Sequence, residues 1–308
     1  MNQVYLDTAR LMTRVAPLVF ADDIFALKGG TAINLFLRDM PRLSVDLDLV
    51  FVDRHLSRDK ALGSINAAIR KAAGRLEANG FRTQITTAAE VGETKLFVRR
   101  DNIQLKVEVN FVTRGTVYPV QTASLTSKAK EVLLADLELP LLSLEEVYGS
   151  KLVAALDRQH PRDLFDVAQL FEHEGITPGI RRVFVVYLAS HNRPIHEVLF
   201  PAKRDIAQDY ERTFKGMTIE PVELAELLST RDRLILELQE NLRPEERQFL
   251  LSLVNAEPDW NLLEIEHLEQ LPAIRWKLHN LRQLAKNNPT KFRDQADELA
   301  RRLKLPLG

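Results

Sequence analysis

Residues 25–51, FALKGGTAINLFLRDMPRLSVDLDLVF, place a Gly-Gly pair shortly before an apolar strand that carries two aspartates. Successive strand side chains point to opposite faces, so Asp46 and Asp48 project together while the apolar residues around them pack on the other face. Two carboxylates on one face repel each other and are costly to desolvate without a cation between them. We therefore predict a divalent cation, Mg²⁺ or Mn²⁺, at Asp46 and Asp48.

The Gly29-Gly30 pair predicts a tight turn that leads into a short helix. Without Cβ atoms, the backbone N–H groups of a glycine pair can approach a phosphate closely, and a helix N-terminus favours negative charge. Beside a metal-binding carboxylate pair, such a turn is what phosphoryl or nucleotidyl transfer needs. Alone, a glycine pair is more often a plain turn, and two aspartates can be an exposed pair without a metal.

A third carboxylate, Glu108, lies on a strand pattern further along the chain. Strand-like runs occupy residues 81–86, 95–100 and 103–112. The last run alternates polar and apolar residues, which predicts one buried face and one polar face, and Glu108 belongs to the polar face. If this strand pairs beside the strand of the two aspartates, three acids converge on one metal site. The alternative is that Glu108 simply faces solvent.

A second group of charged residues occurs in YGSKLVAALDRQHPRDLFDVAQL, residues 148–170. Lys151 and Arg158 are seven residues apart and share one helix face, where they could clamp nucleotide phosphates. Asp163 and Asp166 share a face of the next helix and could orient the basic groups or act as a base. The alternatives are a solvated helix face and, for Asp163, a helix N-cap.

The order of the patterns predicts an α+β fold with two domains. At 308 residues, 45% of them hydrophobic, the chain can hold two domains or one large one. Strands are confined to the first part, and from Ser143 onward the pattern is helical, with Ser143 and Glu146 as a predicted capping box. We place the domains at residues 1–140 and 141–308.

Composition excludes several classes of site and location. The chain has no cysteine, which rules out disulfides, thiolate metal sites and a cysteine nucleophile. No run approaches the ~18 apolar residues of a membrane span, and the N-terminus does not resemble a signal peptide. We therefore expect a cytoplasmic protein without membrane association.

Net charge does not predict nucleic-acid binding, because 42 basic residues balance 43 acidic ones. Only a local patch could bind RNA, and the C-terminal helices hold the best candidate, with few acids nearby. Its residues are Arg275, Lys277, Arg282, Lys286, Lys291, Arg293, Arg301, Arg302 and Lys304. The alternative is a solvated helix face.

Four motifs between Phe25 and Leu170 together resemble a known family. They read LKGGTA, S-x-D-L-D-L-V, K-V-E-V and K-x-x-A-(x)₃-R-(x)₃-R-D-x-x-D, in this order. The chain is similar here to the AbiEii-type nucleotidyltransferases, toxins of bacterial abortive-infection and toxin–antitoxin systems. The resemblance implies a polymerase β-like nucleotidyltransferase core with a mixed sheet, followed by a C-terminal helical domain.

The resemblance also implies roles for the predicted residues. Lys28, Gly29, Gly30 and Thr31 would lie at the nucleotide phosphates, and Asp46 and Asp48 would bind the metal. Lys151 would contact the nucleotide, and Asp163 or Asp166 would be the acid of the fourth motif. Glu108 stands where polymerase β-like enzymes place a third acid, although AbiEii-type members vary there.

The function implied is metal-dependent transfer of a nucleoside monophosphate from an NTP to an acceptor. The acceptor would be an RNA 3′ end, tRNA above all, and a cognate antitoxin encoded by an adjacent gene would counter the toxin. One alternative keeps the chemistry and changes the acceptor to a small molecule or a protein hydroxyl. Another is a nucleotide-binding module without turnover, against which the intact Asp46, Asp48 and Lys151 argue.

Overall fold

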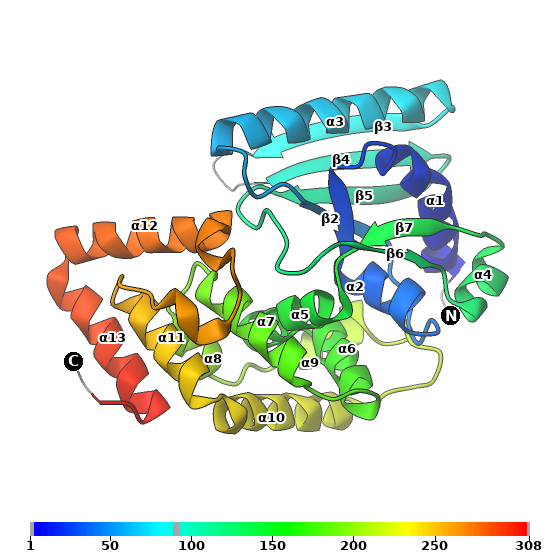
Figure 1. The fold of residues 1–308 in the computed structure, drawn as a ribbon. Helices are drawn as coiled ribbons and strands as arrows, with labels where there is room; N and C mark the ends of the chain where they lie inside the picture. Colours follow the sequence, from blue (N-terminus) through cyan, green and yellow to red (C-terminus); the bar gives the residue numbers. More distant parts are fainter. Residues whose placement is uncertain (1–2, 89–92, 307–308) are drawn as a thin grey trace. The chain divides into compact units, whose positions relative to one another are not determined.

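Alternating apolar residues in the first half of the chain build a seven-stranded mixed sheet with strand order β3-β4-β5-β2-β1-β7-β6 (Figure 1). The computed structural model describes residues 3–88 and 93–306. The strands are β1 (Phe25–Lys28), β2 (Asp46–Phe51), β3 (Arg82–Ala88), β4 (Glu93–Arg100), β5 (Ile103–Asn110), β6 (Gln121–Ser124) and β7 (Glu138–Leu141). β2 runs parallel to β5, and β1 runs parallel to β7, whereas the other neighbouring pairs are antiparallel.

Helices accompany the sheet and then make up the rest of the chain (Figure 1). Near the sheet they are α1 (Gln3–Val19), α2 (Gly29–Ala32), the π-helical turn η1 (Ile33–Leu37), α3 (Arg58–Ala78) and α4 (Ser127–Leu133). The others are α5 (Leu144–Arg158), α6 (Pro161–Glu172), α7 (Pro178–Ala189), α8 (Ile195–Leu199), α9 (Ala207–Thr213), α10 (Leu224–Asn241), α11 (Pro244–Val254), η2 (Trp260–Leu263), η3 (Leu268–Gln270), α12 (Pro272–Asn287) and α13 (Pro289–Leu303). The predicted α+β fold with a mixed sheet and a helical C-terminal region is confirmed.

The chain forms two compact units, one around the sheet and one helical. The sheet unit contains residues 1–147 and 214–222, and the helical unit contains residues 148–213 and 223–308. The division falls inside α5: this helix begins in the sheet unit and continues in the helical unit. The domain boundary that we predicted between residues 140 and 141 stays a prediction.

One face of the sheet is an apolar core on which α1 and α3 pack. Its fully buried side chains include Leu47, Leu49, Leu105, Val107 and Val109. Period-two alternation sends the polar side chains of β2 and β5 to the opposite face, as the sequence predicted. This polar face is where the first group of predicted site residues lies.

The predicted pairing of the two carboxylate strands is confirmed. β2 and β5 are neighbours in the sheet, and Asp48 lies beside Glu108 in the register. β5 ends at Asn110, two residues earlier than predicted, because the Asn110 side-chain oxygen accepts hydrogen bonds from the N–H groups of Val112 (2.8 Å) and Thr113 (2.9 Å). This local turn competes with continued strand pairing.

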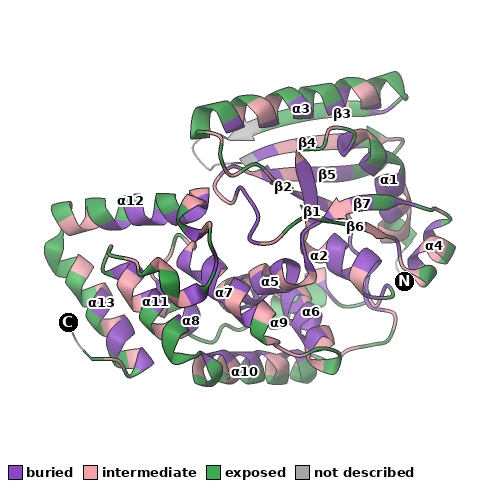
Figure 2. Ribbon diagram, in the orientation of Figure 1, coloured by how far each residue is buried: buried purple, intermediate pink, exposed green. Residues whose placement is uncertain are grey.

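In the helical unit, buried residues line one side of each long helix and exposed residues line the other (Figure 2). Leu227, Leu234 and Leu238 form the buried side of α10, and Leu278 and Leu281 lie on that of α12. This is the 3.6-residue periodicity of helices that pack against a shared core. Within residues 3–88 and 93–306, no helix combines the length and apolarity needed to cross a membrane.

Candidate active site

The Gly-Gly turn joins β1 to α2 and lies directly against β2. Gly29 has φ +76°, a left-handed conformation, and a Cβ placed on it would lie 2.5 Å from Asp48 Oδ2. A Cβ on Gly30 would lie 2.7 Å from the Arg42 guanidinium and 3.0 Å from Ser44 Oγ. Position 29 therefore requires glycine for two reasons: its backbone is left-handed, and Asp48 leaves no room for a Cβ.

Thr31 fixes this turn to the start of β2. Its side chain is buried, and its hydroxyl donates a hydrogen bond to the Asp46 carbonyl oxygen at 2.5 Å and lies 3.0 Å from Ser44 Oγ. The sequence motif links Thr31 to the nucleotide phosphates, and that contact stays a prediction. The structure shows that the hydrogen bond from Thr31 to the Asp46 carbonyl holds the turn beside the two aspartates.

The polar face of the sheet carries acids and lysines in alternation. Lys28 is the cross-strand neighbour of Asp48, and Asp46 is the neighbour of Lys106. The Lys106 ammonium lies 4.0 Å from Asp46 Oδ1 and 2.7 Å from Glu108 Oε2. The Asp48 carboxylate makes no hydrogen bond or ion pair with the residues that the structure describes.

The acids create a negative potential on this face. Burial alone lowers the pKa of Lys106, but Glu108, Asp46 and Asp48 together outweigh that effect and raise its pKa. The same field attracts any cation that approaches Asp46 and Asp48. Sequence reasoning gives Lys106 no role, although its alternation with Glu108 on β5 is the signal that could have found it.

Two carboxylates on one strand face, one of them without a hydrogen bond or ion pair among the described residues, fit a hard divalent cation completed by substrate phosphates. Glu108 differs, because Lys95 (3.3 Å) and Lys106 (2.7 Å) hold its carboxylate. In the described part of the chain, no three His, Cys, Asp or Glu side chains are grouped to hold a metal ion. Metal binding by Asp46, Asp48 and Glu108 therefore stays a prediction.

The second group of predicted residues meets in the helical unit, where α5 and α6 adjoin. The Lys151 ammonium lies 2.8 Å from Asp163 Oδ1 and 3.0 Å from Asp166 Oδ2. Arg158 closes the cluster with a 2.8 Å ion pair to Asp163 Oδ2. Lys151, Asp163 and Asp166 are buried, whereas 60% of the Arg158 side chain is exposed. Charges balance within the cluster, and the guanidinium of Arg158 remains accessible.

The ion pairs decide the protonation of Asp163. Burial alone raises the pKa of Asp163, but the Lys151 ammonium and the Arg158 guanidinium outweigh it and lower the pKa to about 2. A permanently ionised Asp163 is a poor general base at neutral pH, because its proton affinity is too low. We predicted two roles for the aspartates, and this geometry favours one of them: Asp163 orients Lys151 and Arg158.

The N-cap of α6 is His160, so the alternative interpretation of Asp163 as the N-cap is wrong. His160 Nδ1 accepts a hydrogen bond from the Arg162 N–H at 3.1 Å, and its Nε2 lies 3.1 Å from Thr213 Oγ1. Burial lowers the pKa of His160, which keeps the imidazole neutral and able to accept. Histidine is uncommon as a cap, which is why the sequence pointed to the aspartate instead.

The basic C-terminal residues separate into three groups. Lys277 does not belong to a surface, because it is buried and its ammonium donates to the carbonyl oxygens of His191 (2.7 Å) and Arg193 (2.8 Å). Arg301 and Arg302 both pair with Glu298, so α13 is largely neutralised there. The predicted residues that remain exposed without an ion pair in the described chain are Arg275, Arg282, Lys286, Lys291, Arg293 and Lys304.

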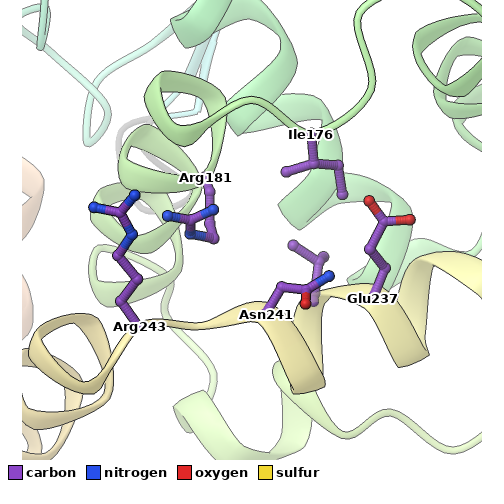
Figure 3. A pocket seen from close by; sticks show the side chains of 6 residues that line it. Ile176, Arg181, Glu237, Asn241 and Arg243 are labelled. Carbon is purple, nitrogen blue, oxygen red and sulfur yellow. The ribbon is translucent and has the colours of Figure 1, made fainter.

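A cavity of about 200 Å³ lies in the helical unit (Figure 3). It is lined by Ile176, Arg181, Glu237, Leu238, Asn241 and Arg243. Arg181 Nε donates to both carboxylate oxygens of Glu246, at 3.1 and 2.9 Å, and this buried pair ties α7 to α11. None of the lining residues was predicted from the sequence, and none belongs to a predicted site.

Residues 10–280 match the family described as "Nucleotidyl transferase AbiEii toxin, Type IV TA system". The chain belongs to the AbiEii family. Both groups of predicted active-site residues, from Lys28 to Asp166, lie inside the matched range. The chain is thus a nucleotidyltransferase toxin of a type IV toxin–antitoxin system, a class that uses a nucleotide substrate and has an antitoxin partner.

The fold is similar to that of MenT4, a nucleotidyltransferase toxin from Mycobacterium tuberculosis H37Rv. The similarity has a TM-score of 0.59 at 18% sequence identity, and it covers 90% of the AbiEii chain and 94% of the MenT4 chain. At this identity the likeness concerns the fold. No curated protein sequence matches the AbiEii chain.

Replacing Gly29 in the AbiEii protein tests the close approach of the turn to Asp48. Gly29→Ala adds left-handed strain of about 1–2 kcal/mol and a clash with Asp48 Oδ2, so we expect lower thermal stability and a loss of activity of about 100-fold. Gly80→Ala is the matched control, because Gly80 has φ +79° and no described atom lies within 4 Å of the place that a Cβ would take. Equal losses of activity in both variants would contradict the proximity argument.

Lys277 predicts a pH dependence of stability. Burial lowers the pKa of Lys277 from 10.5 to about 8, and the opposing effect of Glu197 is smaller. Between these values the unfolded chain binds more protons than the folded one, so the free energy of unfolding rises with pH. In Lys277→Met this rise is absent. Thermal unfolding across this pH range, with exposed Lys286→Met as control, measures the difference, and parallel profiles for wild type and Lys277→Met would contradict it.

Proposed function

We propose that this AbiEii protein transfers a nucleoside monophosphate from an NTP to the 3′ end of an RNA, above all a tRNA. The observation that carries the proposal is the polar sheet face, where Asp46 and Asp48 project together and Asp48 touches the Gly29 turn. Nucleotidyl transfer needs anionic metal ligands next to a backbone that can approach a triphosphate, and the two carboxylates beside the glycine turn support that assignment.

The site would act through positioning and charge. Mg²⁺ or Mn²⁺ held by Asp46 and Asp48 would supply charge stabilisation at the phosphate and lower the pKa of the attacking hydroxyl. Lys28 and the backbone amides of Gly29 and Gly30 would hold the β- and γ-phosphates. The alternation of acids with lysines on this face supports that division, since carboxylates attract a cation and ammonium groups attract an anionic substrate.

The α5–α6 cluster would bind phosphate groups of the nucleotide. Lys151 would neutralise charge as pyrophosphate leaves, and Arg158 would bind a phosphate through its exposed guanidinium. Asp163 supports this role for Arg158, because a 2.8 Å ion pair holds one edge of the guanidinium and leaves the other edge available. Asp166 would hold the Lys151 ammonium in place.

The biological consequence would be arrest of growth. A nucleotide added to the tRNA 3′ end blocks aminoacylation, because the amino acid is attached at that end. A cognate antitoxin, which we expect to be encoded by an adjacent gene, would counter the activity. The cytoplasm is the compartment in which such a substrate is found, and we place the protein there.

Incubation with Mg²⁺, each labelled NTP in turn and total cellular RNA tests the proposal. We expect label from one preferred NTP in one class of RNA, with release of pyrophosphate, and no label when EDTA is present. Label on a small molecule or on a protein would show that the acceptor is not RNA and contradict the RNA assignment. Equilibrium NTP binding without pyrophosphate release would instead indicate a nucleotide-binding module.

A further inference from the structure

Helix α12 is the one long segment of the basic C-terminal region that has no acidic residue of its own, since Pro272–Asn287 contains neither Asp nor Glu. Its basic and aromatic residues follow helical spacing. Arg275, His279, Arg282 and Lys286 stand at positions i, i+4, i+7 and i+11, which places them on one face. All four are exposed, and in the described chain none of them forms an ion pair.

Trp276 begins a second stripe beside the first. Asn280, Gln283 and Asn287 follow it at the same spacing, and all of these residues are exposed. The Trp276 indole stacks on the His279 imidazole, with ring centroids 5.7 Å apart and an angle of 17° between the planes. Of the Trp276 surface, 45% remains open to solvent. A large exposed aromatic ring among cations is typical of a contact surface rather than of a solvated helix face.

The helix that carries these residues is anchored firmly. Ile274, Leu278 and Leu281 are buried on its opposite side. The Lys277 ammonium adds two hydrogen bonds to the carbonyl oxygens of His191 and Arg193, which fix α12 to the segment after α7. A rigid helix presents its exposed side chains without a large ordering cost, which favours its use in binding.

We propose that Arg275, Trp276, His279, Arg282 and Lys286, together the α12 surface, bind single-stranded RNA of the acceptor. The inference rests on the proposed RNA acceptor and adds the place at which that acceptor docks. Trp276 and His279 stack on unpaired bases, and the three cations contact phosphates. From Arg275 to Lys286 the helix is about 16 Å long, the length of roughly five stacked nucleotides at ~3.4 Å each.

RNA explains the α12 surface better than an acidic protein partner does. An acidic protein segment would satisfy the cations, but it has no need of a flat stacked ring pair or of a neighbouring stripe of side-chain amides. Bases offer π-faces to the rings and hydrogen-bonding edges to Asn280 and Gln283. Duplex RNA keeps its bases stacked internally, so the surface favours single strands.

Fluorescence anisotropy with a short 5′-fluorescein-labelled single-stranded RNA, in the absence of NTP, tests the proposal. We expect Trp276→Ala to weaken binding about tenfold and Trp276→Phe to restore most of it. Arg282→Gln should reduce the slope of log affinity against log salt by about 0.7. Leu236→Ala, which removes another exposed apolar side chain, and Arg301→Gln, which removes an ion-paired cation, are the controls and should change little.

Three results would contradict RNA binding by the α12 surface. The first is unchanged RNA affinity in a Trp276→Ala variant that keeps wild-type thermal stability. The others are an equal loss of affinity for duplex RNA of the same sequence and an equal loss of affinity in the two control variants. Tight binding of a labelled polyglutamate peptide that also depends on Trp276 would assign the surface to an acidic protein instead. RNA labelling that is normal in Trp276→Ala would refute the docking site and leave the proposed function intact. If RNA binding depends on Trp276 but the protein transfers no nucleotide to RNA, the docking site is supported and the proposed function is refuted.

Discussion

Asp48→Asn will incorporate no nucleotide into RNA above background, a loss of at least about 1,000-fold, and will unfold at the wild-type temperature or above it. We expect activity to fall because the substitution removes one of the two carboxylates that we propose as metal ligands next to the Gly29 turn. Stability does not fall, because Asp48 forms no ion pair with the described residues and repels Asp46. Labelled NTP incorporation and differential scanning calorimetry of the same preparations measure both effects.

A matched control removes the same charge elsewhere in the sheet unit. Asp136 pairs with Lys130 on the surface, and its side chain is 77% exposed, so Asp136→Asn should leave incorporation unchanged. Normal turnover by Asp48→Asn would end the case for metal binding at β2. Loss of activity together with a large fall in unfolding temperature would show instead that Asp48 supports the fold.

Lys151→Met should lower the free energy of unfolding by about 3–5 kcal/mol, because it leaves Asp163 and Asp166 buried without the cation between them. For a chain of this size, that corresponds to a fall in melting temperature of about 10 °C. The double variant Lys151→Met/Asp166→Asn should recover part of the loss, since it also removes one buried charge. Lys130→Met, at an exposed ion pair, is the control and should cost little.

The acid side of the stability profile provides a second measure of this cluster. The folded-state pKa of Asp163 lies at about 2, below its ordinary value of 3.8. Its stabilising contribution is therefore present above the ordinary pKa and is lost as pH falls through the folded value. Lys151→Met should flatten this acid dependence. An unchanged acid profile and an unchanged melting temperature would mean that the ion pairs contribute nothing to stability.

Sequence periodicity predicted the elements that hold the first group of residues. Alternation in β5 placed Glu108 on the polar face, and pairing with β2 then set it beside Asp48. Periodicity could not show that Lys95 pairs with Glu108. Lys95 lies on β4, and the register of β4 against β5 depends on the hairpin that joins them. Charge partners across strands need tertiary structure, whereas faces follow from spacing alone.

Sequence patterns missed three features of the structure, each for its own physical reason. β7 was missed because Pro140 lies within Glu138–Leu141, and proline argues against a strand even though its carbonyl can still accept. Lys277 looked like a surface residue because lysine is rarely buried, and the two backbone carbonyls that hold it come from a distant segment. Helical spacing put Lys151 and Arg158 on one face, but only the packing of α5 on α6 turned those cations toward Asp163.

The return of residues 214–222 to the sheet unit has a genetic consequence. Met217 accepts a hydrogen bond from the Leu43 N–H at 3.1 Å, Ile219 donates to the Pro41 carbonyl at 3.0 Å, and Thr218 bridges to Arg42. These bonds hold the stretch of chain that leads into β2 and its two aspartates. A stop codon anywhere between residues 148 and 213 would therefore remove the support for β2 as well as the later helices. Cells selected to survive this toxin would gain an inactive protein from early truncation even though every residue of the sheet's seven strands had been translated.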